Sequence, residues 1–258
     1  MVLFRLDEFL TTFQRYCMKA LVFLTMVCCS VGVFAIVPST ITTLSPHIDY
    51  SATIAIDGKN THTYTVKFAQ NGDTSFRITS YFDNQKHLVR QETTHFQAKQ
   101  LKLYVNKIED YRTGEYLFQI PSANGFIAHH RERKGANLET HSIKAENAVP
   151  TTLVSERIAQ SIEAVDRGEN ATFMVALPLH GIVAEMCLTK ARNETVNGVP
   201  CITIRFEPCN IFFRILMGEP GYFTFERAKP NRFMQYKGVL GLTTAEGKRQ
   251  NGFVAIKY

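Results

Sequence analysis

The feature that most constrains the fold is the alternation of large and polar side chains along residues 61–69. Every second position carries a ring or an apolar group, namely His62, Tyr64, Val66 and Phe68. The positions between them carry mainly threonine, with one lysine. A period of two is typical of an antiparallel strand with one buried face. We therefore predict a half-buried strand with these four side chains inward.

The same period recurs along the chain and predicts a protein built mainly of strands. Asn71-Gly72 favours a tight hairpin turn, after which we expect a strand over 74–82 with Phe76 and Ile78 inward. Asp57-Gly58 and Asn197-Gly198 favour further turns. Other strands are predicted near residues 51–57, 87–96, 101–109, 114–120, 126–131, 138–143, 171–177, 182–192, 199–207, 221–227, 232–239 and 252–258.

Residues 152–166 change from this period to that of a helix. An apolar stripe recurs every three or four residues, as Val154, Ile158, Ile162 and Val165. Residues 150–152 form a suitable start, and Gly168 ends the helix. One apolar stripe requires a partner surface. We therefore predict one principal helix that packs against a sheet.

Together these elements predict a mainly β (α+β) fold, in which a curved antiparallel sheet or open half-barrel wraps around the principal helix. The concave face of such a sheet must be covered by a helix or a ligand. We assign residues 38–258 to a single β-rich domain. Two small β-domains joined near 146–152 are the alternative.

An uncharged run over residues 20–37 precedes this domain. A signal-peptide core needs about 7 to 15 apolar residues and a transmembrane helix about 17 to 25, so the run fits a signal peptide or a signal anchor. Small residues at Val33 and Ala35 predict cleavage between Ala35 and Ile36. A leader that began at Met18, followed by Lys19, would have ordinary length, so we take Met18 as the true start.

The charges around this run predict its orientation. Arg5, Arg15 and Lys19 precede it, and no lysine or arginine follows before Lys59. Positive residues stay on the cytoplasmic side, so residues 38–258 are expected outside the cytoplasm. We predict a periplasmic location in the bacterial cell envelope. The domain would be soluble after cleavage, or held in the inner membrane by residues 20–37.

Charge and cysteine content narrow the classes of function. The net charge is +6, of which the leader contributes +1, so the remaining +5 is spread along the domain and predicts no nucleic-acid partner. The domain holds Cys187, Cys201 and Cys209. Three buried thiols are the preferred interpretation. If one pair forms, Cys187 with Cys201 or Cys209 is favoured, because an extended segment from Cys201 to Cys209 spans about 26 Å.

The second half carries a run of strand motifs in a particular order. These are ATFMVALP at 171–178, VPCITIRFEP at 199–208, YFTFERA at 222–228 and RFMQYKG at 232–238. The pattern resembles uncharacterised bacterial exported proteins of the DUF3108-like family and covers roughly residues 60–258. That family is similar in fold to periplasmic lipoprotein carriers and other lipid-binding proteins. The resemblance implies an open half-barrel around helices, and it implies no catalytic residue.

Two segments and one histidine contain residue types that could form a functional site. Residues His129–Lys134 are dense in charge, but neighbours on a strand point to opposite faces, so we interpret them as a solvated strand end or loop. His62 is interpreted as a core or cavity-rim histidine. Residues Ile211–Met217 carry one charge and are expected to close the core, or else to line a pocket mouth.

The sequence contains no nucleotide-binding or metalloprotease motif and no nucleophile elbow. We predict no enzyme activity, no catalytic residue, no metal site and no cofactor. The leading hypothesis is non-catalytic binding of a lipid or other apolar ligand in the concave face, by residues that the sequence does not identify. The alternative is a structural or protein-interaction scaffold. The inner membrane is a partner through the leader if it is not cleaved.

Overall fold

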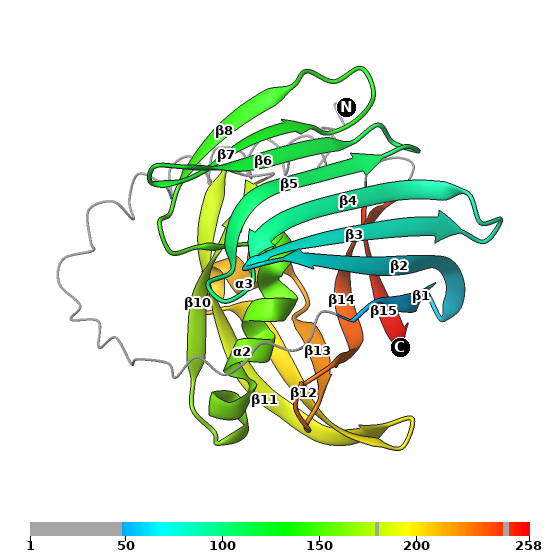
Figure 1. Ribbon diagram of the computed structural model, residues 1–258, viewed down its shortest axis with the longest axis vertical. Helices are drawn as coiled ribbons and strands as arrows, with labels where there is room; N and C mark the ends of the chain where they lie inside the picture. Colours follow the sequence, from blue (N-terminus) through cyan, green and yellow to red (C-terminus); the bar gives the residue numbers. More distant parts are fainter. Residues whose placement is uncertain (1–47, 179–180, 245–247) are drawn as a thin grey trace, which may run out of the picture. The chain divides into compact units, whose positions relative to one another are not determined.

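The computed structural model describes residues 48–178, 181–244 and 248–258. In these ranges the chain is mainly β and forms one long curved sheet (Figure 1). The strands are β1 (Tyr50–Ile56), β2 (Lys59–Asn71), β3 (Thr74–Asp83), β4 (Leu88–Gln97), β5 (Lys102–Asp110), β6 (Tyr116–Ser122), β7 (Gly125–Arg131), β8 (Glu139–Lys144), β9 (Val149–Pro150), β10 (Ala171–Leu177), β11 (Ile182–Val196), β12 (Val199–Pro208), β13 (Gly221–Glu226), β14 (Phe233–Thr243) and β15 (Arg249–Lys257).

The strand order is simple. It runs from β8 back to β1, then through β15, and back again from β14 to β9. The first strand thus pairs with the last, Ala52 opposite Ile256, and both outermost strands come from the middle of the chain. Every pairing is antiparallel except that of β9 with β10. Strands on both sides of residues 146–152 belong to one sheet, so they do not form two separate β-domains.

Two of the predicted hairpin turns have the expected backbone, whereas the turn predicted at Asn71-Gly72 lies one residue later, because Asn71 still pairs with Thr74. Asp57 and Gly58 both have positive φ, of 50° and 73°, between the paired residues Ile56 and Lys59. Asn197 and Gly198 repeat the arrangement, with φ of 51° and 81°. Two successive positive φ angles define the primed turn that matches strand twist, and asparagine, aspartate and glycine are the residues that adopt them at least cost.

The predicted helix is confirmed. A short 3-10 turn, η1 (Thr151–Leu153), leads into α2 (Val154–Asp166). The helix ends in a Schellman motif, in which the amide of Gly168 bonds to the carbonyl of Val165 and that of Glu169 to Ala164. Gly168 has a φ of 85°, which explains why glycine stands at this position.

The stripe of α2 packs against the inward face of the second half of the sheet. Leu153, Ile158 and Val165 are buried among inward residues of β10 to β13 and the β4–β5 connection. Figure 1 shows α2 lying in the hollow of the curved sheet. The fold class predicted from the sequence, an open curved sheet wrapped around one principal helix, is therefore confirmed.

The two ends of the sheet overlap instead of pairing. Ala176 and Val183 lie on the outward face of β10 and β11, because their neighbours Val175 and Ala184 face α2. That outward face packs against inward residues of β5 to β8, among them Leu117, Phe126, Ala128 and Ile143. In Figure 1, β5 to β8 run across β10 and β11. The sheet coils over itself and stays open.

One predicted face is wrong. Phe76 and Ile78 were expected inward, but Ile78 is exposed and the inward positions of β3 are Ser75, Arg77 and Thr79. The alternation does form a strand, but the polar side of β3 is the buried side. Here the register with β2 decides, since Phe68 and Val66 lie inward beside Arg77 and Thr79.

Candidate functional site

The inward face of β3 to β7 carries most of the buried polar side chains, beside apolar residues such as Leu117 and Phe126. Of the buried polar and charged residues in the described ranges, all but Thr203 and Thr224 lie between Ser75 and His130. Strand register aligns several of them in one row across the sheet. The row runs Phe68, Arg77, Thr94, Asn106, Gln119, Ala128 and His141 from β2 to β8. This polar row is the best-defined candidate site.

Arg77 connects the polar row to the principal helix. Its guanidinium bonds to the carboxylate of Glu156 on α2 and to the carbonyl and hydroxyl of Thr152 on η1. Burial opposes the charge on Arg77, but Glu156 holds the pKa of the guanidinium above its usual range. A buried charge is tolerated because it is paired and hydrogen-bonded.

The next residues of the row continue these contacts. The hydroxyl of Thr94 lies 3.1 Å from that of Thr152 and donates to Oδ1 of Asn106 at 3.2 Å. The 3-10 turn is therefore held over the polar row by threonine and arginine contacts.

Several other polar atoms of the row and its surroundings lack hydrogen-bond partners. Nδ2 of Asn106 and both amide atoms of Gln119 are buried without a hydrogen bond, as is Oγ of Ser75 in the same region. A buried polar group left unpaired costs about 1–3 kcal/mol. Such groups are uncommon in native proteins and call for an explanation, such as a bound water, ion or ligand.

A second buried arginine organises the next part of the polar face. Arg90 on β4 donates to Glu92 at 3.0 Å and to Glu115 at 2.8 Å. Nε2 of His130 lies 3.9 Å from the carboxylate of Glu115. Burial keeps the pKa of His130 below its usual value, although Glu115 acts in the opposite direction.

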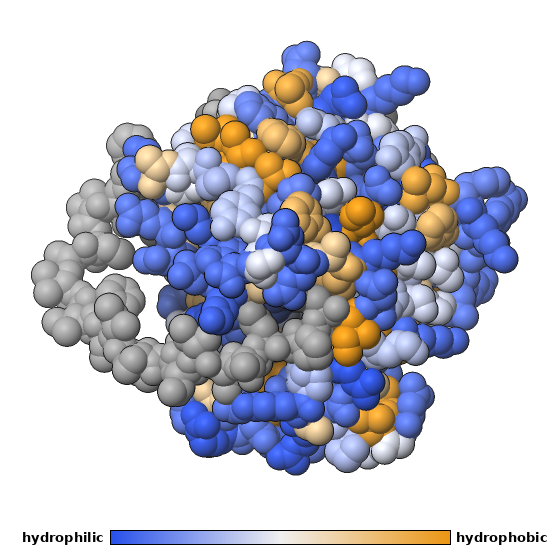
Figure 2. All heavy atoms as spheres, viewed as in Figure 1, coloured by the Kyte–Doolittle hydropathy of each residue, from blue (hydrophilic) through white to orange (hydrophobic). Residues whose placement is uncertain are grey.

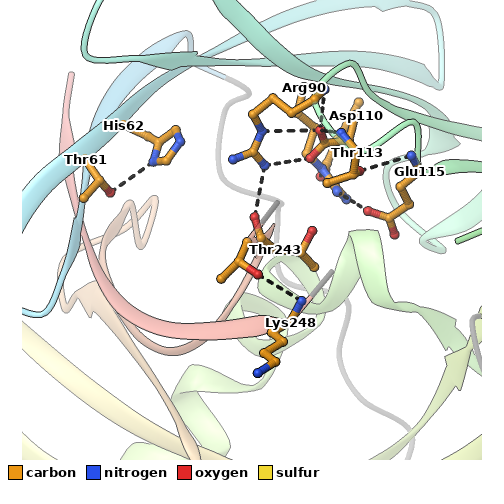
Figure 3. A network of polar contacts seen from close by, with 11 residues as sticks. Thr61, His62, Arg90, Asp110, Thr113, Glu115, Thr243 and Lys248 are labelled. Carbon is orange, nitrogen blue, oxygen red and sulfur yellow. Dashed lines mark hydrogen bonds and ion pairs between the residues drawn. The ribbon is translucent and has the colours of Figure 1, made fainter. Parts of the chain in front are cut away.

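Contacts of Arg112, which we call the clasp, join the β5–β6 turn to the end of β14 (Figure 3). Arg112 donates to both oxygens of Asp110 and to the carbonyl of Thr243 at 3.3 Å. Burial opposes ionisation of Asp110, but hydrogen bonds from Arg112 and Thr113 hold the pKa of the carboxyl below its usual range. The clasp connects segments that lie far apart in the sequence.

His62 lies across from this clasp (Figure 3). It is half-buried, and its Nδ1 lies 3.0 Å from the hydroxyl of Thr61. Burial, and then Arg112, lower the pKa of His62 below its usual value, against smaller opposite effects of Asp83 and Asp110. This placement agrees with the interpretation of His62 as a core or rim histidine.

The histidine-rich segment is only partly as expected. His129 and His130 point to opposite faces of β7, and residues 132–134 are exposed as predicted. His130, however, is buried against Glu115, so it is not part of a solvated end. Within the described ranges, no group of three or more His, Cys, Asp or Glu side chains could hold a metal ion.

The cysteines also differ from the preferred interpretation. Cys187 and Cys209 form a disulfide, and Cys201 is free and buried. Three free thiols were therefore wrong, and the alternative of a Cys187 bridge is resolved in favour of Cys209. The bond is geometrically accessible because β11 and β12 pair, which places Cys187 opposite Glu207, two residues before Cys209.

The segment expected to close the core forms a second helix, α3 (Ile211–Met217). Ile211, Phe212 and Ile215 are exposed, so the expectation of core closure was wrong. A seven-residue apolar run has no period long enough to separate helix from strand. Asn210 was the available signal for a helix, because asparagine is a preferred N-cap residue. Its Oδ1 accepts a hydrogen bond from the amide of Phe212 at 2.8 Å.

The predictions for the N-terminal leader concern residues outside the described ranges. They comprise residues 1–37, the start at Met18 and the cleavage site between Ala35 and Ile36. Among the residues that the structure describes, no helix is both long and apolar enough to span a membrane. On the face drawn in Figure 2, hydrophobic side chains of the described residues form scattered groups among hydrophilic ones.

Comparison with known proteins identifies no family. No family model matches the chain, and no curated protein matches it. Among solved structures, the chain is similar to a β-barrel-like protein of domain of unknown function DUF1849 from Brucella abortus, with 12% identity and a TM-score of 0.44, over 81% of this chain and 95% of that one.

A second similar structure is a DUF1329 family protein from Desulfovibrio piger, with 9% identity and a TM-score of 0.23, over 81% of this chain and 82% of that one. At these values neither likeness identifies a family or a ligand for this chain. Neither structure is described as DUF3108-like, so that family has no further support, whereas the open β fold that the resemblance implies is present in the structure itself.

Proposed function

We propose that this chain is an exported, non-catalytic protein of the bacterial cell envelope that acts as a structural or protein-interaction scaffold. The observation that carries the proposal is the occupancy of the concave face by the protein's own side chains. The stripe of α2 is buried against β10 to β13, with Ile158 fully covered. The overlapping sheet ends cover the apolar residues of β5 to β8.

The disulfide supports export. Cys187–Cys209 joins segments that are 22 residues apart in the sequence. Disulfides persist in oxidising compartments such as the periplasm and are rare in the cytoplasm. Together with the uncharged run at residues 20–37, this favours a periplasmic domain that is released by cleavage or anchored by the run. A phosphatase reporter fused after Tyr258 should be active only if the C-terminus is exported.

The scaffold is favoured over a lipid carrier because of the chemistry of the remaining concave face. An acyl chain gains free energy only from apolar surroundings. The inward face of β3 to β7 carries Arg77, Arg90 and Asn106, which would lose hydrogen bonds or solvation against a hydrocarbon. Binding of a lipid in the concave face would therefore require α2 to leave its place.

Native mass spectrometry of protein purified from the envelope tests this choice. We expect the mass of the unliganded chain, and no uptake of a fluorescent fatty acid. The double variant Ile158→Ala, Ile162→Ala is the matched positive control, because it removes stripe side chains and opens apolar space beneath α2. Lipid bound to the unmodified protein would contradict the scaffold and restore the lipid-binding hypothesis.

The unpaired amides favour a second candidate, the binding of a small uncharged ligand with hydrogen-bonding groups. Asn106 and Gln119 offer donors and an acceptor side by side on β5 and β6. The nearby charge of Arg77 is balanced by Glu156, which favours a neutral ligand. A small bound mass that disappears in Gln119→Leu but persists in Gln91→Leu, on the opposite face, would support this candidate over the scaffold alone.

A further inference from the structure

The most exposed large apolar side chains in the described ranges all lie on α3. Ile215 is 75% exposed, Ile211 65% and Phe212 62%. Ile211 and Ile215, at positions i and i+4, are neighbours on one side of the helix, and Phe212 follows Ile211 directly. We call these three exposed side chains the α3 patch. Burying any of them would be favourable, yet the fold leaves them outside.

The outward orientation of the α3 patch is held by several contacts. The Cys187–Cys209 bond fixes the chain directly before the helix. Asn210 caps its first turn, and the guanidinium of Arg214 donates to the carbonyl of Pro208 at 2.6 Å. The amide of Gly218 closes the helix on the carbonyl of Arg214. The apolar side chains are therefore presented to the exterior by a braced element.

The size of the α3 patch decides what it can contact. A stable protein–protein interface buries about 800 Å² on each partner, from about 20 to 30 residues. Three side chains on a helix of two turns provide much less. A small protruding apolar group of isoleucines and a phenylalanine fits, in contrast, the headgroup and acyl boundary of a bilayer, where the apolar faces of interfacial helices are buried.

The charges around α3 indicate how such contact would work. Arg205 and Arg214 both bind Glu207, at 2.7 Å and 3.3 Å. Glu185, whose carbonyl accepts the amide of Cys209, and Glu219 are also exposed. Among these described residues near α3, the acidic side chains outnumber the basic ones. Contact would rest on apolar insertion and would not require anionic lipids.

We propose that α3 is a membrane-contact element, which inserts Ile211, Phe212 and Ile215 into the interfacial layer of a phospholipid bilayer. The domain would then lie against the membrane with the disulfide-braced end of β11 and β12 toward the lipid. This inference goes beyond the scaffold role, since it assigns the surface by which the domain is oriented in the envelope.

The absence of tryptophan from the sequence makes a direct test available. Phe212→Trp places a single reporter in the α3 patch of the full chain, and Tyr111→Trp places a control at another exposed aromatic position. The two variants are mixed with vesicles of pure phosphatidylcholine and with vesicles that also contain phosphatidylglycerol. Each lipid is used with and without bromine on the acyl chains, which quenches tryptophan only at close range.

We expect Phe212→Trp to shift to shorter emission wavelength and to be quenched by brominated lipid in both vesicle types, also at high salt. Tyr111→Trp should stay unquenched. Adding Ile211→Ser and Ile215→Ser to the reporter should reduce quenching several-fold while the thermal transition stays in place. Because the readout is local, binding through residues 20–37 does not produce the signal.

Other outcomes would overturn the proposal. Phe212→Trp that stays unquenched, or that is quenched no more than Tyr111→Trp, would show that the patch does not meet lipid. A blue shift that grows with protein concentration without vesicles would assign the patch to contact between copies of the chain. Ile215→Trp serves as a second reporter and must give the same result as Phe212→Trp.

Discussion

Strands β3 to β7 and strands β10 to β13 belong to one sheet, yet their inward faces differ in chemistry. The later strands present Val175, Ile202 and Phe225 to the stripe of α2. The earlier strands present Arg77, Asn106 and Gln119, of which Arg77 bonds to Thr152 of η1. The same alternation thus builds a largely apolar interior against α2 and a mixed interior in the earlier strands, where polar side chains lie beside the apolar cluster of β5 to β8.

The difference separates two contributions to the fold. Apolar burial supplies free energy in proportion to area and tolerates many arrangements. A buried arginine tolerates few arrangements, because its hydrogen-bond and ion-pair partners must lie at defined positions. We infer that β10 to β13 with α2 provide most of the stability. The Arg77 and Arg90 clusters specify how the earlier strands are placed.

Breaking the buried ion pair should have the largest effect. Glu156→Ala leaves the Arg77 guanidinium buried without its carboxylate and should lower the free energy of unfolding by about 3–5 kcal/mol. Urea denaturation measures this. Glu163→Ala, which removes the exposed pair with Lys229, should cost at most about 1 kcal/mol. Equal effects of the two variants would contradict a structural role for the Arg77 cluster.

Truncating the stripe of α2 tests the apolar half. Ile158→Ala should lower the free energy of unfolding by about 2–5 kcal/mol, because it leaves a cavity where the side chain was fully buried. Ile215→Ala on the exposed face of α3 should change it by less than about 0.5 kcal/mol. A small effect at Ile158 would mean that α2 packs loosely and that the concave face can open.

The disulfide lies in the apolar half of the sheet, so removing it should destabilise that half more than strands β3 to β7. Replacing Cys187 and Cys209 by alanine should cost about 2–4 kcal/mol, because closing a loop of this length restricts the unfolded chain. Reductant should destabilise the unmodified protein by a similar amount and leave the double variant unchanged. Hydrogen exchange should rise first in β11, β12 and α3, and exchange that rises first in β3 to β7 would argue against this placement.

Removing the unpaired amide of Gln119 should raise the free energy of unfolding, whereas the preceding substitutions should lower it. Gln119→Leu removes a buried amide without partners and keeps a similar volume, so it should raise the free energy of unfolding by about 1 kcal/mol. Gln91→Leu on the other face of the sheet is the matched comparison. A loss of stability in Gln119→Leu would show that the amide has partners in solution, as a bound water or ligand would provide.

The smallest effect concerns pH. Because burial lowers the pKa of His130, the unfolded chain takes up a proton more readily than the folded protein as pH falls. At a pH above about 6.5, the pKa of His130 in the unfolded chain, His130 does not change the stability. Stability falls as the pH drops from there through the lower pKa that His130 has in the folded protein. His130→Asn should lose less stability between about pH 7 and pH 5, as measured by urea denaturation. Parallel pH profiles for the two proteins would contradict this.

Local patterns were sufficient for most element positions. The alternation at residues 61–69 and the turn residues Asp57-Gly58 act through neighbours in the sequence, and the structure has them as predicted. Local patterns were not sufficient to predict which face of a strand is buried where that depends on the partner strand. Phe76 and Ile78 read as inward because they are apolar, but the register with β2 turns Arg77 inward instead. Nothing within β3 alone contains that information.

The candidate site was missed for the same reason. Thr94, Asn106 and Gln119 are unremarkable polar residues in separate strands, and only cross-strand register aligns them. The pairing of Cys187 with Cys209 likewise required the neighbourhood of β11 and β12. Exposure of Ile211 and Phe212 could not be read from their composition, which is that of a core segment.

By itself, the sequence determined the strand-rich class, the principal amphipathic helix and most turn positions, because these follow from side-chain periodicity and backbone preferences within a few residues. Tertiary structure alone decided which face of each strand is buried, where the sheet overlaps itself and which polar groups share the interior. The physical reason is that burial depends on contacts between segments far apart in the chain. One such contact, between Arg77 and Glu156, joins residues 79 positions apart.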